Sequence, residues 1–243
     1  MSDITRRAIV QASGLLAGLQ TSPVGTKLKV IVVGAHPDDP ESSCGGTMAR
    51  YADEGCDVVA LYLTRGEAGI RGKSATDSAA IRSGEAQRAC AILKARAVFA
   101  GQIDGKTEIN EDRYQAFRSL VTAEKPDVLI APWPIDSHRD HRAASLLAYD
   151  AWEHEGRRFE MYYSEVDLGG ETKNFHPTHY VDISNVIERK RQACFAHASQ
   201  NPDSFYGRYH EPMQRLRGLE YGRQAAEAFV SLAQNPRRCS LPA

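Results

Sequence analysis

The sequence lacks the features that mark membrane-spanning and nucleic-acid-binding proteins. None of its 243 residues lie in an apolar stretch that approaches the length of a membrane span, and no fixed-period repeat or low-complexity tract occurs. Its 30 Lys and Arg residues are spread along the chain beside 31 Asp and Glu residues, so that the formal net charge is -1. Because no basic patch is visible, we expect no nucleic-acid partner, no membrane span and no polyanionic substrate.

The motifs of several common enzyme classes are also missing. Gly34, Gly45 and Gly46 do not form a G-x-G-x-x-G sequence, and no Walker A sequence occurs, which disfavours a dinucleotide or nucleotide site. Ser42 and Ser43 are not part of a G-x-S-x-G elbow, which disfavours a serine hydrolase.

Cysteine usage indicates no disulfide framework. The five cysteines show no C-x-x-C spacing, and an odd number cannot all pair within one chain. We therefore expect reduced and mostly buried thiols at Cys44, Cys56, Cys90, Cys194 and Cys239.

Residues 1–26 form an N-terminal extension with two interpretations. Arg6 and Arg7 precede a small apolar run at residues 12–19, as in a twin-arginine export signal, but no clear A-x-A cleavage site follows. The alternative is a short amphipathic helix that ends near Pro23. We expect a cytoplasmic protein, with twin-arginine export as the alternative, and one catalytic domain over residues 27–243.

The rest of the chain alternates between expected strands and helices. Residues 27–35 are rich in Val, Leu and Ile without alternation, which is typical of a strand covered on both faces. Further strands are expected at residues 57–64, 97–100, 127–131, 159–166 and 179–183. Helices are expected at residues 42–54, 78–94, 111–123, 143–154, 185–198 with Ser184 as N-cap, and 213–233.

This alternation predicts a single-domain, Rossmann-like α/β fold with a mostly parallel sheet and helices on both faces. In the common strand order 3-2-1-4-5, the first and fourth strands are neighbours at the point where the winding direction reverses. Doubly wound proteins bind their ligands in the crevice at that point. Residues that follow these two strands are therefore the first candidates for a site.

Clusters of His and Asp follow both of these strands. Residues 36–39 read HPDD, and residues 138–141 read HRDH. We expect His36, Asp39 and His141 to bind one divalent cation, because three protein ligands with open positions form a catalytic pattern. Imidazole and carboxylate ligands suit zinc, our first choice, or Fe²⁺ or another divalent cation.

The remaining polar residues of the two clusters provide proton transfer and charge stabilisation. Asp38 would point beside the metal, so we assign it as the general base. His138 has Asp140 nearby to hold its ring, and a cationic His138 would stabilise the oxyanion of a tetrahedral intermediate. The expected reaction is hydrolysis of an amide or an ester.

Each cluster also has a purely structural interpretation. Asp39 followed by Pro40 could cap one helix, and Asp140 could cap another, which would leave His138 and His141 exposed in a loop. The joint occurrence favours a metal site, because helix capping gives no reason for both loops to be rich in His and Asp. Elsewhere, Arg82 and Glu85 are expected to pair within one helix. Arg65, Glu67 and Arg71 lie in a long glycine-containing loop that could bind a polar substrate.

Several motifs in the same order resemble the PIG-L/LmbE-like de-N-acetylase family. The resemblance spans most of the chain and is carried by residues 36–39 (HPDD), 45–47 (GGT), 63–69 (LTRGEAG), 138–142 (HRDHR), 180–183 (YVDI), 196–200 (AHASQ) and 226–229 (AEAF).

The resemblance implies a Rossmann-like fold, zinc bound at His36, Asp39 and His141, Asp38 as base, and assistance from His138. It implies removal of the acetyl group from an N-acetylglucosamine-type conjugate, a small-molecule amino-sugar substrate. Arg71 is similar to a loop arginine that holds substrate in some members. Asp136 lies near the position of a mobile tyrosine that approaches the substrate, so we place Arg71 and Asp136 in the substrate-binding set.

The sequence departs from the family pattern at Pro40, which precedes Glu41, and at Pro132, where relatives often carry histidine. The second departure lies in the expected substrate pocket and leaves the specificity open. Two alternatives therefore remain: a non-catalytic sugar-binding protein on the same fold, and a metal-dependent hydrolase of another amide. A homo-oligomer is also left open.

Overall fold

The computed structural model describes residues 27–167, 170–232, 234–235 and 240–242. The predicted N-terminal extension and Cys239 lie outside these residues. Within them, Cys44, Cys56, Cys90 and Cys194 are free thiols, and all but Cys56 are buried. The expectation of mostly buried cysteines is thus confirmed for the described part of the chain.

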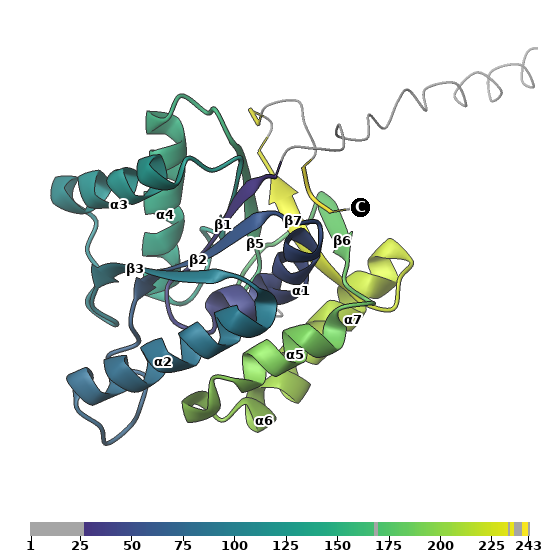
Figure 1. Cartoon of the computed structure of the whole chain (residues 1–243), viewed down its shortest axis with the longest axis horizontal. Coiled ribbons are helices and arrows are strands. Elements are labelled where there is room, and N and C mark those ends of the chain that lie inside the picture. Colours follow the sequence, from purple (N-terminus) through teal and green to yellow (C-terminus); the bar gives the residue numbers. More distant parts are fainter. Residues whose placement is uncertain (1–26, 168–169, 233, 236–239, 243) are drawn as a thin grey trace, which may run out of the picture.

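Within the described residues one sheet of seven strands has the order β3-β2-β1-β4-β5-β7-β6 (Figure 1). The first five strands in the chain pair in parallel, whereas β7 pairs antiparallel with both β5 and β6. The strands are β1 (Lys29–Gly34), β2 (Asp57–Thr64), β3 (Arg96–Gln102), β4 (Val128–Pro132), β5 (Glu160–Ser164), β6 (His179–Asp182) and β7 (Ala226–Ser231).

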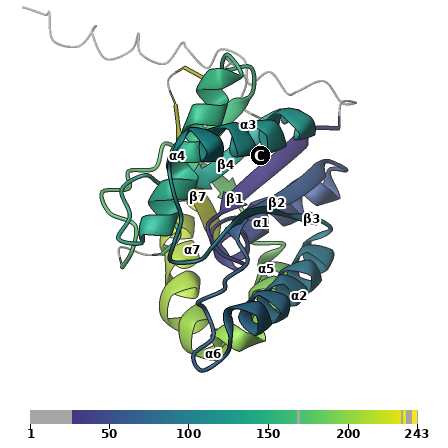
Figure 2. The ribbon, with the colours of Figure 1, turned by 90° about the vertical axis from the view of Figure 1, so that its left-hand side faces the viewer.

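Helices cover both faces of the sheet (Figures 1 and 2). On one face lie α1 (Asp39–Asp53), α2 (Ala75–Leu93) and α5 (Ile187–Phe195), and on the other lie α3 (Glu111–Glu124) and α4 (Arg139–His154). Two hydrophobic clusters fill the spaces between the layers, one containing Met48 and Leu93 and the other Phe117 and Trp152. The predicted Rossmann-like α/β architecture is confirmed.

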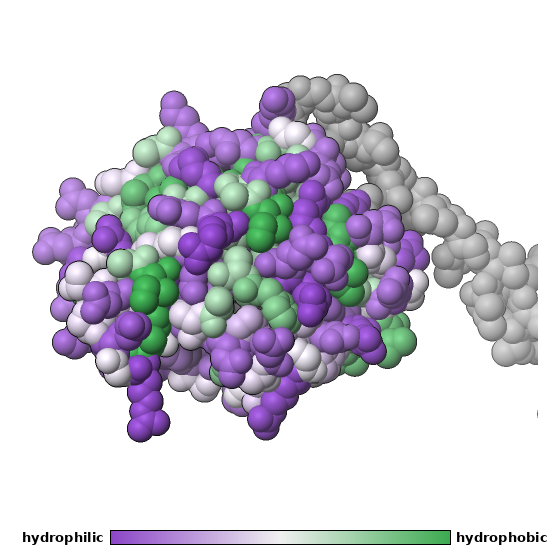
Figure 3. All heavy atoms as spheres, turned by 60° about the horizontal axis from the view of Figure 1, so that its bottom comes forward, coloured by the Kyte–Doolittle hydropathy of each residue, from purple (hydrophilic) through white to green (hydrophobic). Residues whose placement is uncertain are grey.

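The segment after α5 consists of short helical turns and one longer helix. It contains a 3₁₀ turn (Ala198–Gln200), the short helix α6 (Pro202–Phe205), a π-helical turn (Tyr206–His210) and α7 (Glu211–Tyr221). Figures 1 and 2 both place α6 at the bottom of the molecule, below α2 and α5. Figure 3 turns this end forward and shows small, separate apolar patches among hydrophilic side chains. Among the described helices, none has both the length and the apolar character of a membrane span.

The predicted helix at residues 213–233 is wrong in its second half. Helix α7 ends at Tyr221, and Gly222 adopts a left-handed conformation with φ of 71°. A side chain at Gly218 would come within 2.8 Å of the backbone of Ala225, so the chain turns back closely on the helix. Residues 226–231 then form β7 inside the sheet. The sequence hides this strand because the charged Glu227 interrupts its apolar residues, although Glu227 is buried.

The start of α5 also differs from the prediction. Ser184 does not cap this helix, since its hydroxyl donates to Asp182 Oδ1 at 2.5 Å and the helix begins only at Ile187. The other predicted helices and strands exist, with boundaries that shift by a few residues.

The predicted neighbourhood of the first and fourth strands is correct. Residues 30–32 of β1 pair with residues 128–130 of β4, and the chain winds outward from this pair in both directions. The loops that leave the carboxyl ends of β1 and β4 therefore meet at the switch point of the sheet.

Candidate active site

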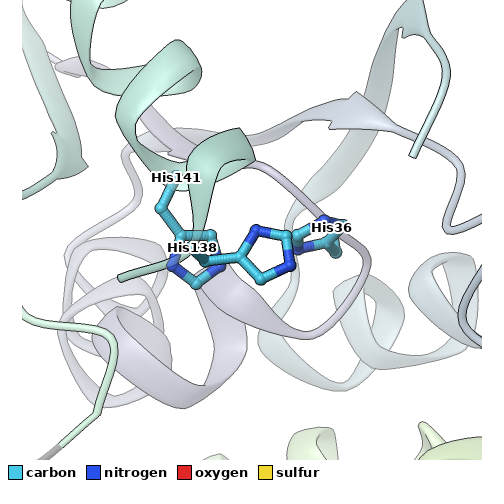
Figure 4. Close-up of side chains that lie close together, drawn as sticks. All are labelled: His36, His138 and His141. Carbon is cyan, nitrogen blue, oxygen red and sulfur yellow. The ribbon is translucent and has the colours of Figure 1, made fainter. Parts of the chain in front are cut away.

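The two His and Asp clusters meet at this switch point. His36 follows β1, while His138 and His141 lie at the start of α4, and Figure 4 shows the three imidazole rings side by side. The ring centroid of His36 lies 4.7 Å from that of His138 and 5.4 Å from that of His141. The sheet thus brings together residues that are about a hundred positions apart.

Asp39 contacts the rings of both His36 and His141. Its Oδ2 lies 3.4 Å from Nδ1 of His36 and 3.4 Å from Nε2 of His141. The same oxygen accepts hydrogen bonds of 2.8 Å from the backbone N–H groups of Ala35 and His36. Burial raises the pKa of Asp39. The nearby His141 and His36 lower it by more, so that the pKa of Asp39 lies well below its usual value. A charged Asp39 carboxylate therefore lies beside one ring nitrogen of each of the two predicted histidine ligands.

Close packing shapes the turn that carries His36 and Asp39. A side chain at Gly34 would come within 2.5 Å of Pro40, so the end of β1 requires glycine. Asp38 has φ of 113°, a conformation that costs free energy in a non-glycine residue and that concentrates at functional sites. The N-cap of α1 is Asp38, not Asp39, and the Asp39 carboxylate accepts the backbone N–H groups of Ala35 and His36, which precede the helix. This arrangement excludes helix capping as the role of Asp39.

The second cluster is likewise more than a helix start. His138 is the N-cap of α4, where its Nδ1 accepts a 3.3 Å hydrogen bond from the backbone N–H of Asp140. His141 is 2% exposed, so it is no loop residue in solvent. Asp140 is fully buried, and its carboxylate accepts hydrogen bonds from Gly105 and Thr107, while His138 is the cap of the helix.

Each candidate metal-binding histidine has a carboxylate at its other ring nitrogen. His36 Nε2 lies 3.3 Å from Asp140 Oδ2 and 3.3 Å from Asp104 Oδ1. His141 Nδ1 lies 3.1 Å from Asp136 Oδ1. Metal-binding histidines in proteins commonly place their second ring nitrogen against a carboxylate, which fixes the tautomer and the ring orientation. This pattern leaves His36 Nδ1 and His141 Nε2 free to bind an ion beside Asp39.

The surrounding carboxylates make the site strongly favourable for positive charge. Burial lowers the pKa of His141, but Asp39 and Asp136 outweigh it and raise that pKa to about 10. The pKa of His36 is likewise raised well above its ordinary value, because Asp39, Asp104 and Asp140 outweigh burial. A divalent cation supplies positive charge at the same place. The donor set of imidazole and carboxylate groups therefore fits zinc or a similar ion.

The described residues contain three groups of potential metal ligands, and within each group the ligand atoms lie within 4.8 Å of one another. All three contain His36 or His141, but none contains Asp39, so the predicted set of His36, Asp39 and His141 is not itself one of these groups. The groups are His36 with His138 and His141; His36 with Asp104 and Asp140; and His141 with Asp136 and Glu171.

Asp38 lies next to this cluster and is held by an arginine. Arg82 Nη2 donates to Asp38 Oδ2 at 3.0 Å and to the carbonyl of Pro37 at 2.5 Å. Burial and the nearby Asp39 raise the pKa of Asp38, while Arg82 lowers it. The predicted pairing of Arg82 with Glu85 is wrong, because Glu85 accepts hydrogen bonds from Ser199 instead.

Two further predictions about this cluster need correction. The carboxylate of Asp140 faces His36 and accepts hydrogen bonds from Thr107 Oγ1 at 2.6 Å and Gly105 N at 2.7 Å, so it does not hold the His138 ring. Burial, His36 and His141 all lower the pKa of His138. These surroundings favour a neutral imidazole, whereas the sequence predicted a cationic one.

The predicted substrate-binding residues also lie elsewhere. Arg71 is exposed and is not among the described residues that line the cavity over the site. Asp136 is 5% exposed, and its carboxylate faces His141 and accepts a 3.1 Å hydrogen bond from Thr172. Asp136 therefore positions a candidate metal ligand, and Arg82 is the arginine that reaches the cavity.

A cavity of about 770 Å³ opens over the cluster. Pockets of this size hold small-molecule ligands. Sequence reasoning missed several of its charged or polar residues, among them Asp104, Arg82 and His197. His197 carried a usable signal, because it lies in the family-like segment at residues 196–200, and so did Gln200, which lines the same cavity.

Comparisons with known proteins agree with this geometry. A family model described as GlcNAc-PI de-N-acetylase, PIG-L, matches residues 31–152. The chain is 30% identical over 237 residues to diacetylchitobiose deacetylase of Thermococcus kodakarensis, with 90% of this chain and 88% of that protein aligned.

Solved structures share the fold. The N,N'-diacetylchitobiose deacetylase from Pyrococcus horikoshii superposes with a TM-score of 0.73 at 23% identity, over 86% of this chain and 87% of that one. GalB, the 4-carboxy-2-hydroxymuconate hydratase from Pseudomonas putida KT2440, superposes with a TM-score of 0.69 at 20% identity, over 90% and 100%. Because a hydratase shares the fold, activity has to be argued from the site.

A doubly wound sheet with this His and Asp cluster at its switch point, together with the sequence relationship, defines the class of Rossmann-like de-N-acetylases. The chain belongs to the PIG-L family of that class, as the sequence motifs predicted.

Proposed function

We propose that this de-N-acetylase is zinc-dependent and removes the acetyl group from an N-acetylglucosamine-type saccharide, with Asp38 as general base. One observation carries the proposal: Asp39 Oδ2 lies 3.4 Å from a ring nitrogen of each of two histidines, and Asp38 stands beside them. The names of the chitobiose deacetylase relatives support the substrate class.

The ligands would be His36 Nδ1, Asp39 Oδ2 and His141 Nε2. Bound zinc in such sites lowers the pKa of water to about 7 and polarises a carbonyl group. Asp104 and Asp140 fix the ring of His36, and Asp136 fixes the ring of His141, so the ligand atoms need little rearrangement.

Asp38 accepts the proton of the attacking water in this mechanism. Its hydrogen bond to Arg82 fixes the direction of one carboxylate oxygen and leaves the other for the water. The proton then passes to the leaving amine, which completes the hydrolysis of the amide.

His138 stabilises the oxyanion as a neutral donor. Since its Nδ1 accepts the backbone N–H of Asp140, the neutral ring carries its proton on Nε2. That proton is available for a hydrogen bond to the developing oxyanion. Loss of one such donor typically costs about 2.7–4 kcal/mol of transition-state stabilisation.

The proposal is tested by metal analysis combined with amine release from N-acetylglucosamine and N,N'-diacetylchitobiose. Asp38→Asn should keep the metal content of the wild type and lose about 10²–10⁴-fold in turnover. Asp112→Asn, an exposed aspartate on α3 outside the cavity, is the matched control and should keep full turnover. Full turnover of Asp38→Asn would reject Asp38 as the base. Amine release that persists after complete metal removal would reject zinc dependence.

A further inference from the structure

The cavity over the active site has an aromatic rim that the reaction itself does not use. Phe205 and Tyr209 both line the cavity. Phe205 is 51% exposed, whereas His36 and Asp39 are 7% and 6% exposed, so the rim lies at the open end of the cavity and the reacting groups at its closed end. Figure 3 turns this side of the molecule, with α6, toward the viewer.

The two rings lie close together on a well-anchored segment. Their centroids are 6.2 Å apart with an interplanar angle of 30°, and the guanidinium of Arg208 lies 5.1 Å from the Tyr209 ring. Between them, Tyr206 is buried, packs edge-on against Phe195 and accepts a 3.1 Å hydrogen bond from Gln214. The buried Tyr206 therefore anchors the segment that carries the rings of Phe205 and Tyr209 at the cavity.

A π-helical turn creates this arrangement. Tyr206–His210 winds more widely than an α-helix, and such turns occur mostly at functional sites. Pro202 and the left-handed Asn201, with φ of 53°, fix the start of the segment. The wide turn therefore positions rings at the cavity rather than in the core.

The charges of the cavity limit what the rim can bind. Among the described residues that line the cavity, Arg82 is the single Lys or Arg, and its guanidinium is hydrogen-bonded to Asp38 and Pro37. Carboxylates of Asp104, Asp167 and Glu171 line the same cavity. A phosphate group inside the cavity would meet these carboxylates, while the one lysine or arginine among the described lining residues is already bound to Asp38, and this costs free energy. Arg208, whose guanidinium lies over the Tyr209 ring, is not among the lining residues.

The rim also differs from a site for an acyl chain. The cavity is lined by the polar side chains of Gln200 and His210 as well as by these aromatic rings. A pyranose ring matches this mixture, because one of its faces presents C–H groups and its edge presents hydroxyls. Aromatic side chains offer a large apolar surface that such a face can cover.

We propose that Phe205 and Tyr209 form a second sugar subsite, so that the preferred substrate is an uncharged saccharide of at least two rings and not a phosphate-bearing glycoside. The acetamido ring occupies the inner cavity, and the next ring stacks on the rim. This inference rests on the proposed function for the placement of the first ring.

Binding and kinetics of paired substrates test the subsite. N,N'-diacetylchitobiose should bind the Asp38→Asn protein about tenfold more tightly than N-acetylglucosamine, as measured by calorimetry without turnover. N-acetylglucosamine 1-phosphate should bind more weakly than N-acetylglucosamine. Phe205→Ala and Tyr209→Ala should each raise KM for the disaccharide about tenfold with little change in kcat, and should leave kcat/KM for the monosaccharide unchanged.

Two control variants separate the subsite from general damage. Leu219→Ala removes a side chain that is 78% exposed on α7 and outside the cavity. It should change neither the KM for the monosaccharide nor the KM for the disaccharide. Phe205→Trp retains an aromatic face and should keep the low KM for the disaccharide.

The inference fails if the wild type binds the monosaccharide and the disaccharide equally, or if Phe205→Ala and Tyr209→Ala affect both substrates alike. It also fails if the phosphate-bearing sugar binds best. Failure of the proposed function gives a different result, since no amine would then be released from either sugar while the binding measurements would still report on the rim.

Discussion

Asp39 Oδ2 lies 3.4 Å from His141 Nε2, although Asp39 follows β1 and His141 belongs to α4. The pairing of β1 with β4 brings these residues together. The same carboxylate oxygen also faces His36 and two backbone N–H groups, so Asp39 is the centre of the proposed metal site.

Metal removal is expected to destabilise the protein. An ion that binds only the folded state adds about 2.7 kcal/mol at a concentration of 100 times its Kd, so zinc added to the chelated protein should raise Tm. Asp39→Ala removes the central carboxylate and should abolish this response. Differential scanning calorimetry measures both effects, and an equal zinc-dependent rise in the variant would argue against Asp39 as a ligand.

Arg82→Gln is expected to change the pH dependence of the reaction. Arg82 lowers the pKa of Asp38, so its loss should raise that pKa. Because the base must be ionised, the acid limb of the kcat/KM profile should move to higher pH and activity at neutral pH should fall. Arg88→Gln, an exposed arginine on the same helix, is the matched control. An acid limb that stays in place would disprove the coupling of Arg82 to Asp38.

Asp136→Asn is expected to weaken metal binding without removing a ligand. Asp136 faces the ring nitrogen of His141 that points away from Asp39. Loss of such a partner typically lowers metal affinity about 10–100-fold. Competition with a chromogenic chelator measures the affinity, and Ser137→Ala, an exposed neighbour, should leave it unchanged. Unchanged affinity in Asp136→Asn would show that the ring of His141 is held by other contacts.

Lys190→Met is expected to destabilise the fold. Lys190 Nζ lies 2.6 Å from Glu227 Oε1 in a fully buried pair, and Glu227 also accepts the N–H groups of Gly46 and Thr47. Removal of the lysine leaves a buried charge without its partner, which typically costs about 3–5 kcal/mol.

Urea denaturation measures this loss. Arg191→Met, on the exposed side of the same helix, should change stability little. The double variant Lys190→Met/Glu227→Gln should recover part of the loss, because it removes the unpaired charge. A single variant as stable as the wild type would refute the structural role of the pair.

Local patterns were sufficient for most of the fold. The uninterrupted apolar runs that became β1, β2 and β4 predicted buried parallel strands, and the strand order then placed residues 36–39 opposite residues 138–141. The β7 strand was not predicted, because its buried Glu227 is stabilised by Lys190 from α5, and no local pattern reveals that partner.

The candidate site divides in the same way. The sequence by itself determined which candidate ligands and which candidate base stand together, because His36, Asp38, Asp39 and His141 belong to two short motifs at strand ends. Only the tertiary structure decided which groups surround them: Asp104 and Asp140 on His36, Asp136 on His141, Arg82 on Asp38, and the aromatic rim at Phe205 and Tyr209. The physical reason is that hydrogen bonds and charges act over a few ångströms in space, and these partners come from loops and helices whose positions the packing of the whole sheet determines.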